Sequence, residues 1–149
     1  MKDFYIIGVM SGTSIDGLDL VYVKFTFDKS WKFKIISTKT YEYDYEWQIA
    51  LTRIVENNIE SVKQIDQNYT RLLSEYILQF INEYNIGKID FVSSHGHTAL
   101  HDPSNSLTYQ LGNLPELSNY LGLKIICDFR IQDVQFGGQG APLVKKKKK

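Results

Sequence analysis

A continuous apolar run over residues 4–10, FYIIGVM, constrains the fold more than any other stretch of this sequence. Such a run is typical of a strand buried at the centre of a sheet. Residues 18–27 alternate in character, and residues 31–43 place Trp31, Phe33 and Ile35 on one face with lysines on the other. Both patterns predict strands, so the first part of the chain is expected to form a meander of three antiparallel strands.

Two helical patterns follow the predicted meander. Residues 45–57 carry apolar side chains at helical spacing, and residues 61–85 carry a longer apolar and aromatic stripe. Ser61 and Gln64 fit a capping box, and Gly87 is a suitable stop signal. We interpret the aromatic stripe of the long helix as core packing.

The remaining elements complete an α/β pattern. Residues 88–94 predict a strand that ends in a polar loop at 95–103, residues 113–122 predict a short helix capped by Asn113, and residues 123–129 predict a last strand. The order βββ-α-α-β-α-β predicts a mixed sheet flanked by helices. Sites in such sheets form at the carboxyl ends of strands, and three of the strand exits here are polar.

The first polar exit combines glycines with hydroxyl side chains. Gly12 and Gly17 permit close backbone approach, and a tight loop of this kind directs N–H groups at an anion such as phosphate. Asp16 and Asp19 are acceptors suited to Mg²⁺, directly or through water. The stretch is not a Walker A loop, because it lacks the Gly-Lys-Ser/Thr ending and opens onto a strand. A plain hairpin turn explains its composition as well, so both interpretations stay open.

The second exit contains all three histidines, His95, His97 and His101. His95 and His97 point the same way if the strand continues, which makes a zinc-dependent hydrolase an alternative function. The spacing matches no specific zinc signature. Loop histidines more often bind substrate or form hydrogen bonds, so that role is the other hypothesis for this exit.

The third exit supplies Asp128 and Arg130, followed by a glycine-rich stretch at 137–140. An aspartate and an arginine at a strand end are suited to gripping a polar, anionic ligand. An internal ion pair that holds the loop is the alternative interpretation.

Composition limits the function classes. Five of the 17 basic residues form the terminal run Lys145–Lys149, which leaves 12 against 17 acidic residues and so no nucleic-acid footprint. No stretch is apolar enough to span a bilayer and no leader is evident. The lone Cys127 lies in an apolar run and predicts a buried thiol and a cytoplasmic location. We interpret the lysine run as a tag or a truncation scar, and a non-enzymatic module that docks through this tail is a further alternative.

Four stretches together resemble one protein family: IGVMSGTSIDGLD, SHGHTALHDP, LTYQLGN and CDFRIQDVQFGGQGAPLV, in this order between residues 6 and 144. They are similar to the anhydro-N-acetylmuramic acid kinases. The resemblance implies an RNase H-like lobe of the actin-like ATPase and sugar kinase superfold. It also implies the use of ATP and Mg²⁺ to convert 1,6-anhydro-N-acetylmuramic acid into N-acetylmuramic acid 6-phosphate in peptidoglycan recycling.

The resemblance also implies roles for individual residues. The ATP phosphate loop would comprise Gly12, Thr13, Ser14, Ile15, Asp16, Gly17, Leu18 and Asp19, with Asp16 toward Mg²⁺. The sugar side would comprise His95, His97, Asp128 and Arg130. Position 97 is often glutamine in the family, and histidine keeps the capacity to form hydrogen bonds there.

The end of the sequence departs from the family pattern. We expect residues 1–144 to form the N-terminal kinase lobe and residues 145–149 a separate tail. The second lobe would supply the adenosine pocket and the general base. We therefore expect no turnover from this chain alone, because phosphoryl transfer needs a cleft with two walls. Apolar surface exposed on a single lobe would favour a homodimer.

Overall fold

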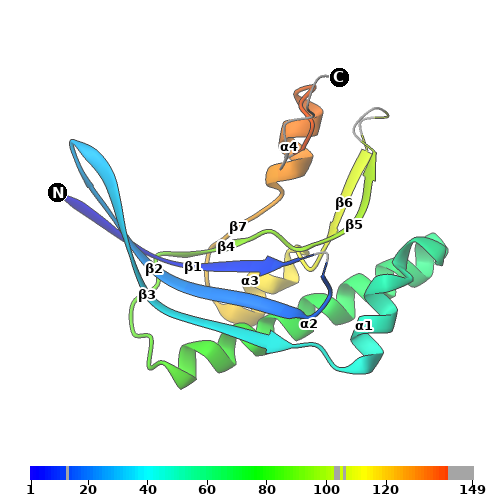
Figure 1. The fold of residues 1–149 in the computed structure, drawn as a ribbon, viewed down its shortest axis with the longest axis horizontal. Coiled ribbons are helices and arrows are strands. Elements are labelled where there is room, and N and C mark those ends of the chain that lie inside the picture. Colours follow the sequence, from blue (N-terminus) through cyan, green and yellow to red (C-terminus); the bar gives the residue numbers. More distant parts are fainter. Residues whose placement is uncertain (13, 103–104, 106, 141–149) are drawn as a thin grey trace.

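A five-stranded mixed sheet organises the molecule, with the strand order β3-β2-β1-β4-β7 (Figure 1). The structure is a computed structural model that describes residues 1–12, 14–102, 105 and 107–140. The first three strands are β1 (Lys2–Ser11), β2 (Gly17–Asp28) and β3 (Ser30–Glu42), and they pair antiparallel. Strands β4 (Phe91–Ser94) and β7 (Ile125–Ile126) run parallel to β1. The predicted meander and the mixed sheet are both confirmed.

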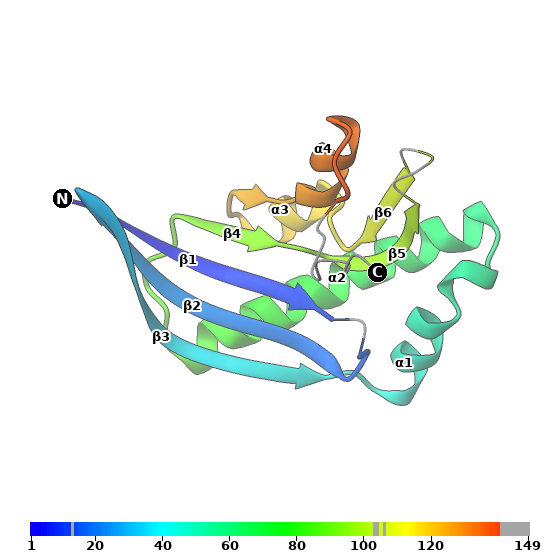
Figure 2. The ribbon, with the colours of Figure 1, turned by 45° about the horizontal axis from the view of Figure 1, so that its top comes forward.

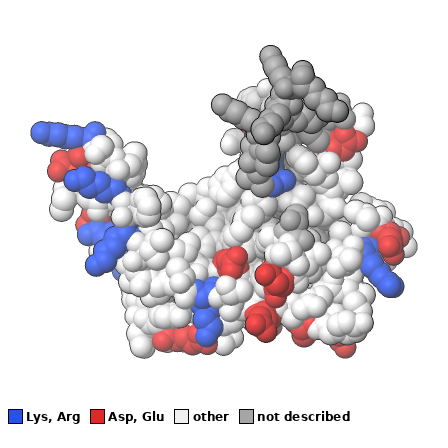
Figure 3. Space-filling model, in the orientation of Figure 1, with Lys and Arg blue, Asp and Glu red and all other residues white. Residues whose placement is uncertain are grey.

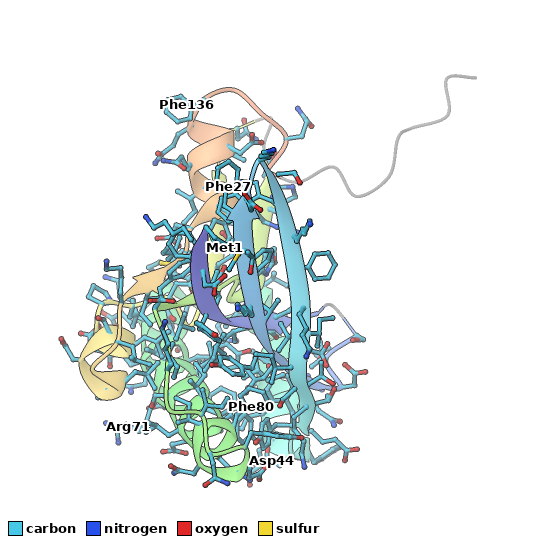
Figure 4. The ribbon with its side chains drawn as sticks, turned by 90° about the vertical axis from the view of Figure 1, so that its left-hand side faces the viewer. Met1, Phe27, Asp44, Arg71, Phe80 and Phe136 are labelled. Atoms are coloured by element: carbon cyan, nitrogen blue, oxygen red, sulfur yellow. The ribbon has the colours of Figure 1, made fainter. Side chains whose placement is uncertain are left out.

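Helix α2 (Ile59–Glu83) covers one face of this sheet (Figure 2). Its stripe of Leu73, Ile77 and Phe80 is fully buried, together with Ile7 of β1 and Leu18 of β2. Figure 4 shows Phe80 between the helix and the strands. Burial of this stripe supplies the core, at about 25 cal/mol for each Å² of apolar surface removed from water. The prediction of core packing is confirmed for this part of the stripe.

The ends of α2 differ from the predicted ones. Asn58 is the N-cap, and its side chain accepts from the backbone N–H of Ser61, so the capping box on Ser61 is wrong. At the other end Tyr84 is the C-cap and Asn85 adopts a positive φ of 50°. Asparagine tolerates this conformation, so the helix ends before Gly87.

The shorter helices pack around these elements. Helix α1 (Tyr45–Thr52) begins at the cap residue Asp44, and a 3₁₀ turn, η1 (Ile54–Glu56), follows it. Helix α3 (Glu116–Leu121) contacts α2 and ends, as predicted, at a left-handed Gly122. Asn113 does not cap it, because the chain enters the helix through Pro115. Among the described residues no helix is both long and apolar enough to cross a membrane.

A hairpin of two strands and one helix were not predicted. The polar loop expected at 95–103 is instead the start of a hairpin of β5 (His97–Asp102) and β6 (Leu107–Leu111), which leaves the main sheet after a turn at Gly96. The strand expected over 123–129 is paired only at β7, and helix α4 (Phe129–Gln135) follows it. Asp128 adopts a left-handed conformation, with φ of 64°. The backbone turns away from the strand at this residue, which is the N-cap of the helix.

The face of the sheet opposite α2 is open over most of its length. Phe25 pairs with Phe33, and Phe27 with Trp31, so aromatic side chains line this face beyond the end of the hydrophobic core. Phe33 is 69% exposed. Figure 3 shows basic side chains gathered on the arm formed by the N-terminus and the β2–β3 hairpin. Helix α4 stands at the opposite end (Figure 1).

Candidate functional site

The carboxyl ends of the parallel strands β1, β4 and β7 meet at one edge of the sheet. The three predicted polar exits leave from these ends. Ser11 closes β1, His95 follows β4, and Asp128 follows β7. The convergence is a consequence of parallel pairing, because strands that share a direction end at the same edge.

The β1–β2 loop, residues 12–16, is a tight turn between paired strands. Ser11 pairs with Leu18 across the hairpin, and the N–H of Ile15 donates to the carbonyl of Gly12 at 3.4 Å. Ile15 adopts a φ of 55°, which is a strained conformation for a β-branched residue. Such strain is concentrated at functional sites. Thr13 lies outside the described residues.

Asp16 is tied into this loop by its side chain. Ser14 Oγ donates to Asp16 Oδ1 at 2.6 Å, and this bond is the main reason why the pKa of the Asp16 carboxyl lies below its ordinary value. The carbonyl of Asp16 accepts from the N–H of Tyr43, which joins the loop to the segment after β3. The carboxylate is exposed and ionised at neutral pH.

The two glycines of the first exit differ in whether a larger residue would fit in their place. A Cβ atom on Gly17 would lie 2.5 Å from the carbonyl oxygen of Tyr41, so packing of β2 against β3 requires glycine. A Cβ atom on Gly12 would meet Ser14 Oγ at 3.4 Å, which is ordinary contact. Leu18 is also structural, since its side chain is fully buried in the core.

A cavity of about 700 Å³ lies on the open face of the sheet, beside the first exit. Its lining includes Asp19, Thr40, Ser93, His95 and Phe129. Asp19 Oδ1 accepts from Thr40 Oγ1 at 2.6 Å, which orients this exposed carboxylate at the rim. The lining therefore joins residues from β2, β3, β4 and α4 around one concavity.

The second and third exits are joined by hydrogen bonds. Arg130 Nε donates to His95 Nε2 at 3.0 Å, and His95 Nδ1 lies 2.8 Å from the carbonyl oxygen of Gly96. Because Nε2 accepts, Nδ1 is the protonated nitrogen of His95. Arg130 thus binds a ring nitrogen at this exit, and among the described residues it forms no ion pair with Asp128, which was the alternative interpretation.

Asn113 is a site residue that the sequence analysis placed wrongly as a helix cap. Its Oδ1 accepts from Ser94 Oγ at 2.8 Å, and its Nδ2 lies 3.4 Å from both the carbonyl of His95 and Oδ1 of Asp128. It therefore holds the ends of β4 and β7 in register. Its position two residues after β6 gave no signal for this role.

The three histidines occupy three different surroundings. His97 is 3% exposed and its Nδ1 lies 3.0 Å from Ser11 Oγ, whereas the exposed His101 contacts Thr108. Burial, with a smaller contribution from His95, lowers the pKa of His97 to about 4. Gly96, with a φ of 69°, separates His95 and His97 and breaks the strand alternation on which the shared direction depended. In the described part of the chain no three His, Cys, Asp or Glu side chains form a group able to hold a metal ion.

Comparison with known proteins identifies the family. The family profile described as anhydro-N-acetylmuramic acid kinase matches residues 4–149. The chain belongs to this family. It is 34% identical over 148 residues to the anhydro-N-acetylmuramic acid kinase of Sulfurimonas denitrificans, 33% over 151 residues to that of Haemophilus influenzae, and 36% over 148 residues to that of Mannheimia succiniciproducens. These alignments cover 95%, 97% and 97% of this chain.

The family assignment confirms the resemblance seen in the motifs. It also agrees with the fold class, because the mixed sheet and its helices fit one lobe of the sugar kinase and actin-like ATPase fold. The chain spans 39%, 38% and 39% of the length of these three relatives. The lysine run from Lys145 lies outside the described residues.

Proposed function

We propose that this chain is the phosphate-binding lobe of an ATP-dependent anhydro-N-acetylmuramic acid kinase. In this proposal the whole protein hydrates the anhydro ring at the anomeric carbon and transfers the γ-phosphoryl group to the freed 6-oxygen. The reaction serves cytoplasmic recycling of cell-wall sugars. The remaining part of the protein supplies the adenosine pocket and the base that activates water.

The β1–β2 loop is proposed to bind the ATP phosphates. Its support is a loop at the carboxyl end of β1 that joins two paired strands and contains the strained Ile15. Backbone N–H groups of such a turn stabilise phosphate oxygens. Gly12, Ser14 and Asp16 are the described residues placed to contact them.

Mg²⁺ is proposed to lie beside the same loop. This ion is usually held by one or two carboxylates, with substrate phosphates and water completing its shell. Asp16 and Asp19 are both exposed carboxylates at the start of β2, and the lowered pKa keeps Asp16 ionised. The donor set fits the ion, which when bound would neutralise charge on the transferring phosphoryl group.

The sugar is proposed to lie against the second and third exits. His95 is fixed by Arg130, and Asp128 by Asn113, so these polar groups are pre-positioned beside the cavity. The guanidinium keeps further N–H donors for the carboxylate of an N-acetylmuramic acid derivative, since only Nε is used by His95. The observation that carries the proposal is the convergence of the three exits at one edge of the sheet, where Met10, His95 and Phe129 line one cavity.

The proposal is tested by isothermal titration of the chain with Mg²⁺-ATP. We expect Asp16→Ala to weaken binding about tenfold, equivalent to about 1.4 kcal/mol. Asp28→Ala is the matched control, because it removes the same charge from the opposite end of β2. Equal affinity of the wild type and Asp16→Ala would contradict the assignment of the loop. Subsequent titration with the anhydro sugar, against Arg130→Gln, tests the other side in the same way.

A further inference from the structure

Four buried polar side chains form a continuous line behind the β1–β2 loop. Tyr69 of α2 meets Tyr43, with 2.5 Å between the phenol oxygens. The Tyr43 hydroxyl donates to Ser11 Oγ at 3.0 Å, and Ser11 Oγ lies 3.0 Å from His97 Nδ1. None of the four residues is more than 3% exposed. Water therefore does not compete for their protons, and each buried donor needs an acceptor within the protein.

The direction of this line follows from the number of protons that each hydroxyl owns. A phenol has a single proton. Since Tyr43 gives its proton to Ser11, the proton between the two phenol oxygens belongs to Tyr69. The line runs from Tyr69 to Tyr43 to Ser11, and Ser11 keeps its own proton to donate.

His97 Nδ1 is the acceptor that remains for the Ser11 proton. If Nδ1 were protonated, Ser11 Oγ would accept two hydrogen bonds, and its own proton would be left only with the nearby phenol oxygen of Tyr69, to which Ser11 forms no hydrogen bond of regular geometry in the described ranges. An enclosed donor without a partner is costly. The satisfied arrangement therefore has a bare Nδ1, and the proton of the neutral ring on Nε2.

We propose that the hydroxyl line Tyr69–Tyr43–Ser11 fixes neutral His97 in the tautomer that is protonated at Nε2, so that the ring offers a hydrogen-bond donor to a ligand. Ser11 and Tyr43 are positioning residues that act through His97. Nε2 of His97 has no hydrogen-bond partner in the described ranges. Among those ranges Gln110 Oε1 is the one side-chain polar atom that is both enclosed and without a partner. Nε2 of His97 also lacks a partner, so it is not an enclosed atom.

His95 shows the opposite state only two residues away. Its Nδ1 carries the proton, and both of its nitrogens are already engaged by Gly96 and Arg130. His97 is thus the ring with a spare donor. This inference deepens the proposed function and rests on it for the ligand: an acceptor oxygen of the sugar, such as a hydroxyl or the acetamido carbonyl, is the group that an Nε2–H would recognise.

The tautomer is measured directly by long-range ¹H–¹⁵N correlation spectroscopy on the chain labelled with ¹⁵N-histidine. At neutral pH we expect a pyridine-type Nδ1 and a pyrrole-type Nε2 for His97. The reverse pattern would overturn the proposal at once. This measurement needs no ligand, so its result stands whether or not the proposed kinase function holds.

Three hydroxyl deletions test the direction of the line. Ser11→Ala removes the hydroxyl that donates to Nδ1, so a mixture of both tautomers is expected. Tyr69→Phe leaves the bond from Tyr43 to Ser11 intact, and the Nε2-protonated form should persist. Tyr76→Phe, on the same helix but donating to the carbonyl of Glu42 near the surface, is the matched control. An unchanged tautomer in Ser11→Ala, or equal changes in Ser11→Ala and Tyr69→Phe, would contradict a directed line and leave only a packing role.

A final titration tests the ligand. Addition of 1,6-anhydro-N-acetylmuramic acid should shift the His97 Nε2 resonance in the wild type and shift it less in Ser11→Ala. If the sugar binds but His97 Nε2 does not respond, the donor role is wrong while the kinase proposal survives. If Mg²⁺-ATP and the sugar both fail to bind, the kinase proposal fails while the tautomer result is unaffected.

Discussion

Two buried polar clusters begin one helical turn apart on α2. They differ in the charge of their groups and in the elements that they reach. Tyr69 begins the line of neutral hydroxyl groups that ends at His97. Asp66, which is 1% exposed, is a carboxylate that accepts from Tyr109 Oη and from the N–H of Gly112 at 2.7 Å. Residues three apart on a helix lie on the same face, so Asp66 and Tyr69 belong to the same buried stripe of α2.

The elements that each cluster contacts indicate its structural role. The hydroxyl line reaches the β1–β2 loop and the exit of β4, so it connects α2 to the candidate site. The Asp66 cluster reaches β6 and the turn after it, so it fastens the β5–β6 hairpin to the helix. One part of the buried stripe orients a ring, and the other holds a hairpin in place.

The Asp66 cluster should dominate stability. Asp66→Ala leaves two buried donors, on Tyr109 and Gly112, without an acceptor. At about 1–3 kcal/mol for each unpaired group, we expect a loss of about 4 kcal/mol in the free energy of unfolding. Urea denaturation followed by circular dichroism measures it. Asp66→Asn keeps an acceptor for Gly112 and should lose less, and a loss below about 1 kcal/mol for Asp66→Ala would show that the cluster is not structural.

The clusters should also respond to pH in opposite directions. The pKa of His97 falls from 6.5 to about 4 on folding, mainly by burial, so between these values the unfolded chain binds more protons. Stability is therefore lost as the pH falls through this interval, by up to about 3 kcal/mol. Burial raises the pKa of the Asp66 carboxyl, so its contribution is present at low pH and is lost as the pH rises above the ordinary aspartate value.

Urea titrations across pH 4 to 7 separate the two effects. The groups that face His97 are His95 on the same exit and the phenols of Tyr43 and Tyr69. His97→Gln should remove most of the acid sensitivity in this range, and Asp66→Asn should make it steeper. Acid sensitivity that is unchanged in His97→Gln would show that other groups control it.

Much of this arrangement follows from sequence periodicity, and the rest does not. The meander and the α2 stripe were predictable because alternation and helical spacing report which face is buried. The same spacing placed Tyr69 in the core, but it carried no information on the partner of its hydroxyl group. That partner, Tyr43, comes from a segment after β3, and Ser11 from the end of β1. Their meeting depends on tertiary packing.

The candidate site was predictable to a similar extent. The three polar exits were visible in the sequence, because each follows an apolar strand. The β5–β6 hairpin was hidden, since its strands are short and polar and depend on the left-handed Gly96. Helix α4 was not predictable, because it begins after Asp128 adopts a left-handed conformation that the residue type alone does not indicate. The link through Asn113 appears only when β4 and β7 lie side by side.

Gly112 connects the two clusters, and its substitution should disturb both. Its N–H donates to Asp66, its φ is 88°, and a Cβ atom there would lie 2.9 Å from the ring of Tyr69. Backbone strain and overpacking together predict a loss of about 2 kcal/mol for Gly112→Ala. Gly122→Ala is a useful control, with a similar φ of 63° but nothing within 4 Å, and should lose only the strain contribution. Equal losses in the two variants would remove the argument that Gly112 packs between the clusters.

The smallest effect compares one hydroxyl from each cluster. Tyr109→Phe removes a hydrogen bond to a buried carboxylate, whereas Tyr69→Phe removes a single bond between neutral groups. Bonds to charged groups contribute about 1.5–3 kcal/mol and neutral ones about 0.5–1.5, so Tyr109→Phe should be less stable than Tyr69→Phe by about 1 kcal/mol at pH 8. The gap should narrow when Asp66 is protonated, because the carboxyl is then neutral. A gap that is the same at pH 4 and pH 8 would mean that charge does not distinguish the two clusters, and that their difference lies in packing alone.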